Sequence, residues 1–170
     1  ISVLDENGDM FVALSDMSVL QKMTVDFIHS KSSIIKGSRL ITCDPALHPD
    51  VMEEILNLYS DTIPVFVDPV SCAYAETIVD FIGKFHTAKP NILETEILSG
   101  MKIKSKKDLY KAAEKILDKG LKRIFISLGA DGCLYMDREG KHIERKLAPV
   151  EHMVNATGAG DAFMAAVIYS

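Results

Sequence analysis

The feature that most constrains the fold is an alternation of short strand-like and longer helix-like segments. Apolar runs at 39–43, 64–68 and 123–129 have the length and residue types of buried strands. The longer segments, at 48–61, 73–85 and 106–120, space their apolar residues as a helix does. Strands that alternate with helices form parallel pairs, because each helix carries the chain back across the sheet. This order predicts an α/β fold, a mostly parallel, doubly wound sheet with helices on both faces.

Local signals place further elements around this framework. The runs ISVL and MFVAL enclose Asn7-Gly8, a dipeptide that favours a tight turn, so a β-hairpin is expected over residues 1–14. Two more strands are expected at 132–137 and 141–146. Thr24 and Ser105 are candidate helix N-caps, and Gly100 is a candidate helix end.

Composition excludes several classes of protein. With 170 residues, 48% of them hydrophobic, the chain can bury one sizeable core and is not disordered. A net charge of -5 gives no reason to expect a nucleic-acid partner, and no apolar run is long enough for a membrane span. The three cysteines, an odd number without a pairing pattern, indicate buried thiols in a reducing compartment. We therefore expect an intracellular protein, cytoplasmic or organellar.

Polar residues follow three of the expected strands, where ligands bind in parallel sheets. Asp44 and Asp68 each come after one strand, and Gly129 and Gly132 flank the turn after a third. Asp and Gly also form ordinary turns, so that simpler interpretation stays open for each position.

The motif Gly158-Ala159-Gly160-Asp161 precedes an apolar, helix-like run. Small residues admit a ligand close to the backbone, and the first amides of a helix attract anions. It is neither a P-loop, since it lacks the lysine, nor a dinucleotide fingerprint, since Phe163 replaces the third glycine. A carboxylate here suits phosphoryl transfer, in which Asp161 would deprotonate an attacking hydroxyl. The alternative is that Asp161 only stabilises the first helical turn.

Asn91 and Glu94 lie three residues apart, on one face of a helix start. An amide oxygen and a carboxylate suit Mg²⁺ that is bound together with substrate phosphates. The alternative is an exposed helix with Asn91 as its N-cap. The five histidines show no spacing typical of zinc ligands.

Three segments, KPNILETEILSG, ISLGADGCLYMD and NATGAGDAF, occur in that order and together resemble the ribokinase-like (PfkB) carbohydrate kinases. The resemblance covers almost the whole chain. Within the family, VFVDPVSCAYAE and VLDENGDMFVALSDM are most similar to pseudouridine kinases. The resemblance implies an ATP-dependent kinase that phosphorylates a ribosyl hydroxyl, the 5′-hydroxyl of pseudouridine, or else another sugar or nucleoside kinase of the family.

The resemblance also implies residue roles. Asp161 would be the base, and the anion hole for the transferred phosphoryl group would be Gly158, Ala159 and Gly160. The residues expected at the ATP phosphates and the metal are Ser127, Gly129, Gly132, Thr157, Asn91, Glu94 and Asp68, the last acting through the metal's waters. ATP, Mg²⁺ and a monovalent cation are the implied cofactors, and the partner is a small sugar or nucleoside, with no nucleic acid and no membrane.

The chain departs from the family pattern in two ways. Asn155 stands where the family usually has aspartate, which removes a charge near the phosphates. Family members are longer, so we expect a fragment that lacks both ends, with residues 1–14 as part of a lid that supports a homodimer and 15–170 as an incomplete kinase domain. The isolated chain is then a candidate for a fragment without activity.

Overall fold

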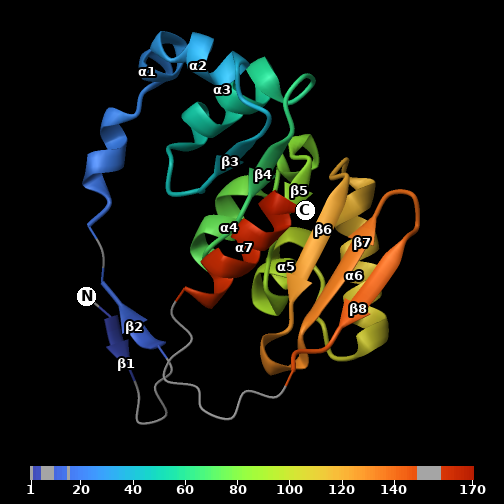
Figure 1. Ribbon diagram of the computed structural model, residues 1–170. Helices are drawn as coiled ribbons and strands as arrows, with labels where there is room; N and C mark the ends of the chain where they lie inside the picture. Colours follow the sequence, from blue (N-terminus) through green and yellow to red (C-terminus); the bar gives the residue numbers. More distant parts are fainter. Residues whose placement is uncertain (1, 5–9, 15, 149–157) are drawn as a thin grey trace. The chain divides into compact units, whose positions relative to one another are not determined.

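The computed structural model describes residues 2–4, 10–14, 16–148 and 158–170. It divides into two units, one of residues 1–18 with 148–170 and one of residues 19–147. The larger unit contains a six-stranded sheet, whose order is β3-β4-β5-β6-β7-β8 (Figure 1). The strands are β3 (Ile41–Cys43), β4 (Val65–Val67), β5 (Thr87–Ala88), β6 (Arg123–Ser127), β7 (Cys133–Asp137) and β8 (His142–Arg145).

The strand pairing is mixed and mostly parallel. β3, β4, β5 and β6 pair in parallel, whereas β7 pairs antiparallel with β6 and β8 antiparallel with β7. The longer connections between the parallel strands contain helices, as a parallel pair requires. The α/β class with a mostly parallel sheet, predicted from the sequence, is confirmed.

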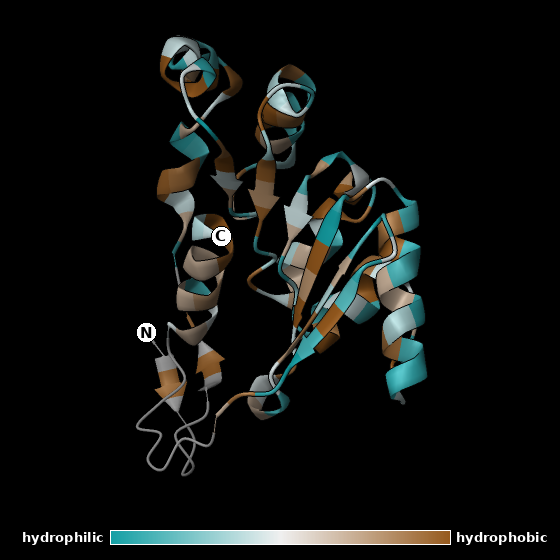
Figure 2. Ribbon diagram, turned by 45° about the vertical axis from the view of Figure 1, so that its right-hand side comes forward, coloured by the Kyte–Doolittle hydropathy of each residue, from teal (hydrophilic) through white to brown (hydrophobic). Residues whose placement is uncertain are grey.

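The longer helices of this unit bury one side and expose the other. They are α1 (Val25–Ser30), α2 (Ser32–Lys36), α3 (Pro49–Tyr59), α4 (Cys72–Ile78), α5 (Ile92–Ser99) and α6 (Lys106–Asp118), with the short helices η1 (Ser18–Lys22), η2 (Ile82–Lys84) and η3 (Gly129–Asp131). In α6, Leu109, Ala112, Ala113, Ile116 and Leu117 are buried, and this spacing marks one helical face. Figure 2 shows hydrophilic and hydrophobic residues alternating along α6.

The predicted helix signals are present. The Phe27 N–H donates to the Thr24 hydroxyl (3.2 Å), and the Asp108 N–H donates to the Ser105 hydroxyl (3.2 Å). Gly100 ends α5 with a φ of 64°, the left-handed conformation that glycine adopts most easily.

One predicted element is wrong in its extent. The helix expected over residues 73–85 ends as α4 at Ile78, and the chain continues through η2 into β5, a strand that was not predicted. Gly83 in η2 packs so closely on the end of α6 that a Cβ atom there would overlap with the Lys119 carbonyl. This contact and the pairing of β5 with β4 and β6 are tertiary effects, which local periodicity does not reveal.

The smaller unit contains a hairpin and a helix. β1 (Ser2–Leu4) pairs antiparallel with β2 (Met10–Ala13), as predicted, while the Asn7-Gly8 turn lies outside the described residues. Helix α7 spans Ala159–Tyr169. That the hairpin is part of a lid stays a prediction. Among the described residues, no helix has the length and hydrophobicity to cross a membrane.

Candidate nucleotide and metal site

The larger unit gathers polar groups at the carboxyl ends of β4, β5 and β6. Asp68 follows β4, Lys89 and Asn91 follow β5, and Ser127 is the last residue of β6. Because these three strands are neighbours and parallel, their carboxyl ends form one edge of the sheet. The connection is direct between β5 and β6, since the Ser127 N–H donates to the Pro90 carbonyl (2.9 Å). The topology therefore brings Asp68, Asn91 and Ser127 to the same edge.

Asn91 and Glu94 form a reciprocal cap at the start of α5. The Glu94 N–H donates to Asn91 Oδ1 (2.9 Å), and the Asn91 N–H donates to Glu94 Oε2 (2.8 Å). This is a capping box, which satisfies two backbone donors at the helix start. The helix-capping alternative considered from the sequence is thus present, and it leaves Glu94 Oε1 and the second lone pair of Asn91 Oδ1 for other ligands.

Glu94 is only 2% exposed. Burial raises the pKa of its carboxyl group, and the charge of Asp68 raises it further, whereas the hydrogen bond from Asn91 and the charge of Lys89 lower it. These opposing influences show that Asp68, Lys89 and Glu94 form one electrostatic group. A divalent cation near Glu94 would favour its ionised form in the same way as Lys89 does.

Lys89 and Asp68 form a buried ion pair, which sequence reasoning missed. The Lys89 ammonium lies 2.9 Å from Asp68 Oδ2, and the two side chains are 6% and 18% exposed. No local sequence signal pointed to it, because Lys89 follows β5, a two-residue strand that the sequence did not predict. A buried lysine almost always has a partner. Asp68 also has the turn role considered above, because its Oδ1 accepts a hydrogen bond from the Val70 N–H (3.3 Å). Val70 has a φ of 64°, a conformation that is unusual for a β-branched residue.

The oxygen donors of this site suit a partly hydrated Mg²⁺ better than a metal ion that is coordinated by protein side chains alone. Within the described ranges, no three or more His, Cys, Asp or Glu side chains are grouped to enclose a metal. Mg²⁺ usually keeps several waters and takes one or two carboxylates together with substrate phosphates. Glu94 and Asn91 fit that pattern, with Asp68 acting through water, whereas they do not form a closed cage.

The two glycines of the turn after β6 have different surroundings. Gly129 has a φ of 60°, and no atom lies within 4 Å of where its Cβ would be. Gly132 has a φ of 99°, and a Cβ there would overlap with the Arg145 carbonyl of β8. Gly132 is therefore required for packing between β7 and β8, while Gly129 leaves backbone open to a ligand.

In the smaller unit, the Gly158–Asp161 motif begins α7. Gly158 is the N-cap with a φ of 82°, and no side chain caps the helix. Ala159, Gly160 and Asp161 form the first turn and are exposed. A helix start of small residues without a side-chain cap presents its N–H groups to solvent, which suits an anion. Thr157 lies outside the described residues.

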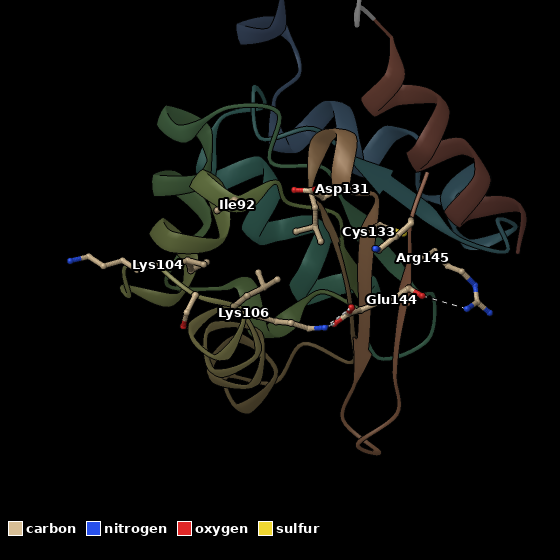
Figure 3. A pocket seen from close by; sticks show the side chains of 12 residues that line it. Ile92, Lys104, Lys106, Asp131, Cys133, Glu144 and Arg145 are labelled. Carbon is tan, nitrogen blue, oxygen red and sulfur yellow. Dashed lines mark hydrogen bonds and ion pairs between the residues drawn. The ribbon is translucent and has the colours of Figure 1, made fainter. Parts of the chain in front are cut away.

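A cavity of about 440 Å³ adjoins the strand edge (Figure 3). Ile92, Leu109, Leu128 and Cys133 contribute apolar surface to it. On its border Glu144 binds the Lys106 ammonium (2.8 Å) and accepts a hydrogen bond from the Tyr110 hydroxyl. Figure 3 shows Lys104 and Arg145 extending away from the cavity. The cavity thus has a large apolar surface, and of its two acidic residues, Asp131 and Glu144, the second is already paired.

Comparison with known proteins identifies the family. Residues 4–170 match the pfkB family carbohydrate kinases. The chain belongs to this family. It is 36% identical over 166 residues to the pseudouridine kinase of Escherichia coli, an alignment that covers 97% of this chain and 52% of the relative. It is 26% identical over 160 residues to a 1-phosphofructokinase of Borreliella burgdorferi, covering 94% of this chain and 49% of that one.

Solved structures agree with this assignment. A proposed sugar kinase from Clostridium perfringens is 40% identical, with a TM-score of 0.84, and the match covers 99% of this chain and 52% of that one. A ribokinase from Arabidopsis thaliana, solved with ribose and ATP, shares the fold with a TM-score of 0.71 at 21% identity, over 82% of this chain and 45% of that one. The chain therefore spans about half the length of the relatives it matches.

Proposed function

We propose that the whole protein is an ATP-dependent kinase that phosphorylates the 5′-hydroxyl of pseudouridine. Membership of the pfkB family supports carbohydrate or nucleoside kinase activity. The 36% identity to a pseudouridine kinase, which extends over nearly the whole chain, is the observation that carries the choice of substrate. The chain spans about half of that relative, so the proposal concerns the whole protein and not the isolated chain.

In this proposal Asp161 is the general base. An exposed carboxylate at the start of α7 is free to approach a substrate hydroxyl and accept its proton. The N–H groups of Gly158, Ala159 and Gly160 would stabilise the charge of the transferred phosphoryl group. Their geometry supports the proposal, because α7 begins without a side-chain cap that would compete for these donors.

The sheet edge of the larger unit would hold the nucleotide phosphates and Mg²⁺. Asn91 and Glu94 would bind the metal and its phosphates, and Asp68 would hold metal-bound water. Ser127, Gly129, Gly132 and Thr157 would line the ATP site, with Gly129 as the point of closest backbone approach. When bound, Mg²⁺ would neutralise phosphate charge. A monovalent cation, a homodimer formed through the hairpin and a cytoplasmic location belong to the same proposal.

A second candidate is another sugar kinase of the family. It is favoured by the 1-phosphofructokinases, one of which, from Escherichia coli, is 37% identical over 81 residues. That alignment covers 48% of this chain, whereas the pseudouridine kinase alignment covers 97%. The wider coverage makes pseudouridine the first choice.

The test is transfer of radiolabelled phosphate from ATP to a panel of acceptors. The whole protein is assayed with pseudouridine, uridine, ribose, adenosine and fructose 1-phosphate, with kcat/KM compared between them. The proposal expects pseudouridine to be the best acceptor. A higher kcat/KM for fructose 1-phosphate or ribose than for pseudouridine would contradict the first proposal and support the second candidate, another sugar kinase of the family. Absence of transfer to every acceptor would contradict both.

A further inference from the structure

A second cavity lies at the other end of the sheet from the candidate site. Its volume is about 540 Å³, and it is lined by His86, Lys122, Arg123, Asp137, Arg138 and Glu139. His86 comes directly before β5, and Arg123 begins β6, so the cavity lies at the amino ends of two parallel strands. β7 runs antiparallel to β6, which brings its last residue, Asp137, opposite Arg123. The nucleotide and metal residues lie at the carboxyl ends of the same strands.

Three cationic side chains line this cavity, together with the carboxylates of Asp137 and Glu139. The ion pairs formed among the described residues include none with Lys122, Arg123 or Arg138. With both carboxylates counted, the cavity lining keeps a net positive charge in an otherwise acidic chain, and such a site attracts anions.

One of the two carboxylates, Asp137, is already hydrogen-bonded within its own turn. Asp137 Oδ2 accepts a hydrogen bond from the Tyr135 hydroxyl (2.8 Å). Asp137 Oδ1 accepts from the N–H groups of Glu139 and Lys141, both at 3.0 Å. These bonds engage both carboxylate oxygens of Asp137, which forms no ion pair with the three cations among the described residues.

His86 adds a polar wall to the cavity. Its ring stacks on Phe66 with centroids 5.5 Å apart and an interplanar angle of 6°, and its Nδ1 shares a hydrogen bond with the Thr87 hydroxyl (2.9 Å). Burial lowers the pKa of His86, and the charges of Arg123 and Lys122 lower it further. The ring is therefore held in place, and its lowered pKa reflects first its burial and second the positive charges of Arg123 and Lys122.

We propose that this cavity binds a small phosphate-bearing anion, separately from the nucleotide site. Arginine suits such a ligand because its planar guanidinium donates two parallel hydrogen bonds to phosphate oxygens. Two arginines and a lysine around a cavity of about 540 Å³ have room for a pyrophosphate or a phosphorylated metabolite. The acidic net charge of the chain argues against a nucleic-acid polymer as the ligand.

The test is titration of the chain with inorganic pyrophosphate in the absence of metal ions and ATP. Binding is measured by calorimetry and by NMR of the arginine side-chain N–H groups and the His86 ring. The variant is Arg123→Gln with Arg138→Gln, and the matched control is Arg39→Gln with Lys107→Gln, which removes the same charge from exposed positions elsewhere. The single variant Arg123→Lys keeps the charge but loses the paired donors.

We expect saturable binding that the cavity variant weakens at least about tenfold, that the control leaves unchanged and that Arg123→Lys weakens to an intermediate degree. The resonances of the His86 ring in the wild-type chain should shift as pyrophosphate binds. Urea unfolding of each variant verifies that it is folded. No saturation up to about 1 mM would overturn the proposal. Equal weakening by cavity and control variants would also overturn it, because it would show non-specific attraction only. Tighter binding of a DNA or RNA oligonucleotide than of pyrophosphate would overturn the proposal of a small anion and indicate a nucleic acid as the ligand.

Discussion

Replacing Lys89 by methionine should destabilise the chain strongly. The substitution keeps the length of the side chain but removes a cation that is 5% exposed and lies 2.9 Å from Asp68 Oδ2. It leaves Asp68 and the buried Glu94 without the positive charge between them. Removing one partner of a buried pair costs about 3–5 kcal/mol, because the other charge stays buried without compensation. Asp68 is 18% exposed and keeps some water, so we expect the lower end, about 3 kcal/mol.

Urea unfolding followed by circular dichroism measures this effect. With a slope of about 2 kcal/mol per molar urea, the midpoint should fall by about 1.5 M. The control is Lys84→Met, since Lys84 pairs with Glu53 at 3.4 Å with both side chains exposed. That loss should stay below about 1 kcal/mol. The double variant Lys89→Met with Asp68→Asn should recover most of the stability. Equal midpoints for the two lysine variants would refute the reasoning.

Three further outcomes are expected. Gly83→Ala should destabilise the chain by about 1–3 kcal/mol, because its Cβ would overlap with neighbouring backbone. Gly37→Ala should not, because its Cβ would make only ordinary van der Waals contacts with two carbonyl oxygens, and thermal melts of the two variants compare them. Hydrogen bonds hold the pKa of Glu96 below 4.5, so Glu96→Gln should lower stability at pH 7, and this difference should disappear as the pH falls through the lowered pKa. Burial raises the pKa of Cys43 to about 12, so iodoacetamide should label exposed Cys72 and spare Cys43 in the folded chain.

Much of the fold could be predicted because its signals are local. The strands that became β4 and β6 are continuous apolar runs, and the caps at Thr24, Ser105 and Gly100 depend on a few neighbouring residues. β5 could not be predicted in this way. It is two residues long, and it exists because it pairs with β4 and β6, which lie far from it in the sequence.

In the candidate site, too, the features with a local sequence signal could be predicted, and those that depend on tertiary contacts could not. The spacing of Asn91 and Glu94 predicted a shared helix face, and both the metal interpretation and the capping alternative are compatible with the capping box that forms. Lys89 was missed because its partner, Asp68, is twenty-one positions earlier and becomes a neighbour only through the parallel pairing of β4 and β5. The packing role of Gly132 depends on β8 and was equally hidden. The role of Asp161 stays a prediction.

The measurement that tests the central claim most directly is phosphoryl transfer from ATP to pseudouridine by the whole protein and its Asp161→Asn variant. Asparagine keeps the shape of the side chain at the exposed start of α7 but cannot accept the proton. A positioned general base contributes about 10²- to 10⁴-fold to the rate. We expect kcat to fall by at least about 100-fold, with the KM values for ATP and pseudouridine little changed. A variant with the turnover of the wild type would contradict the assignment of Asp161 as the base.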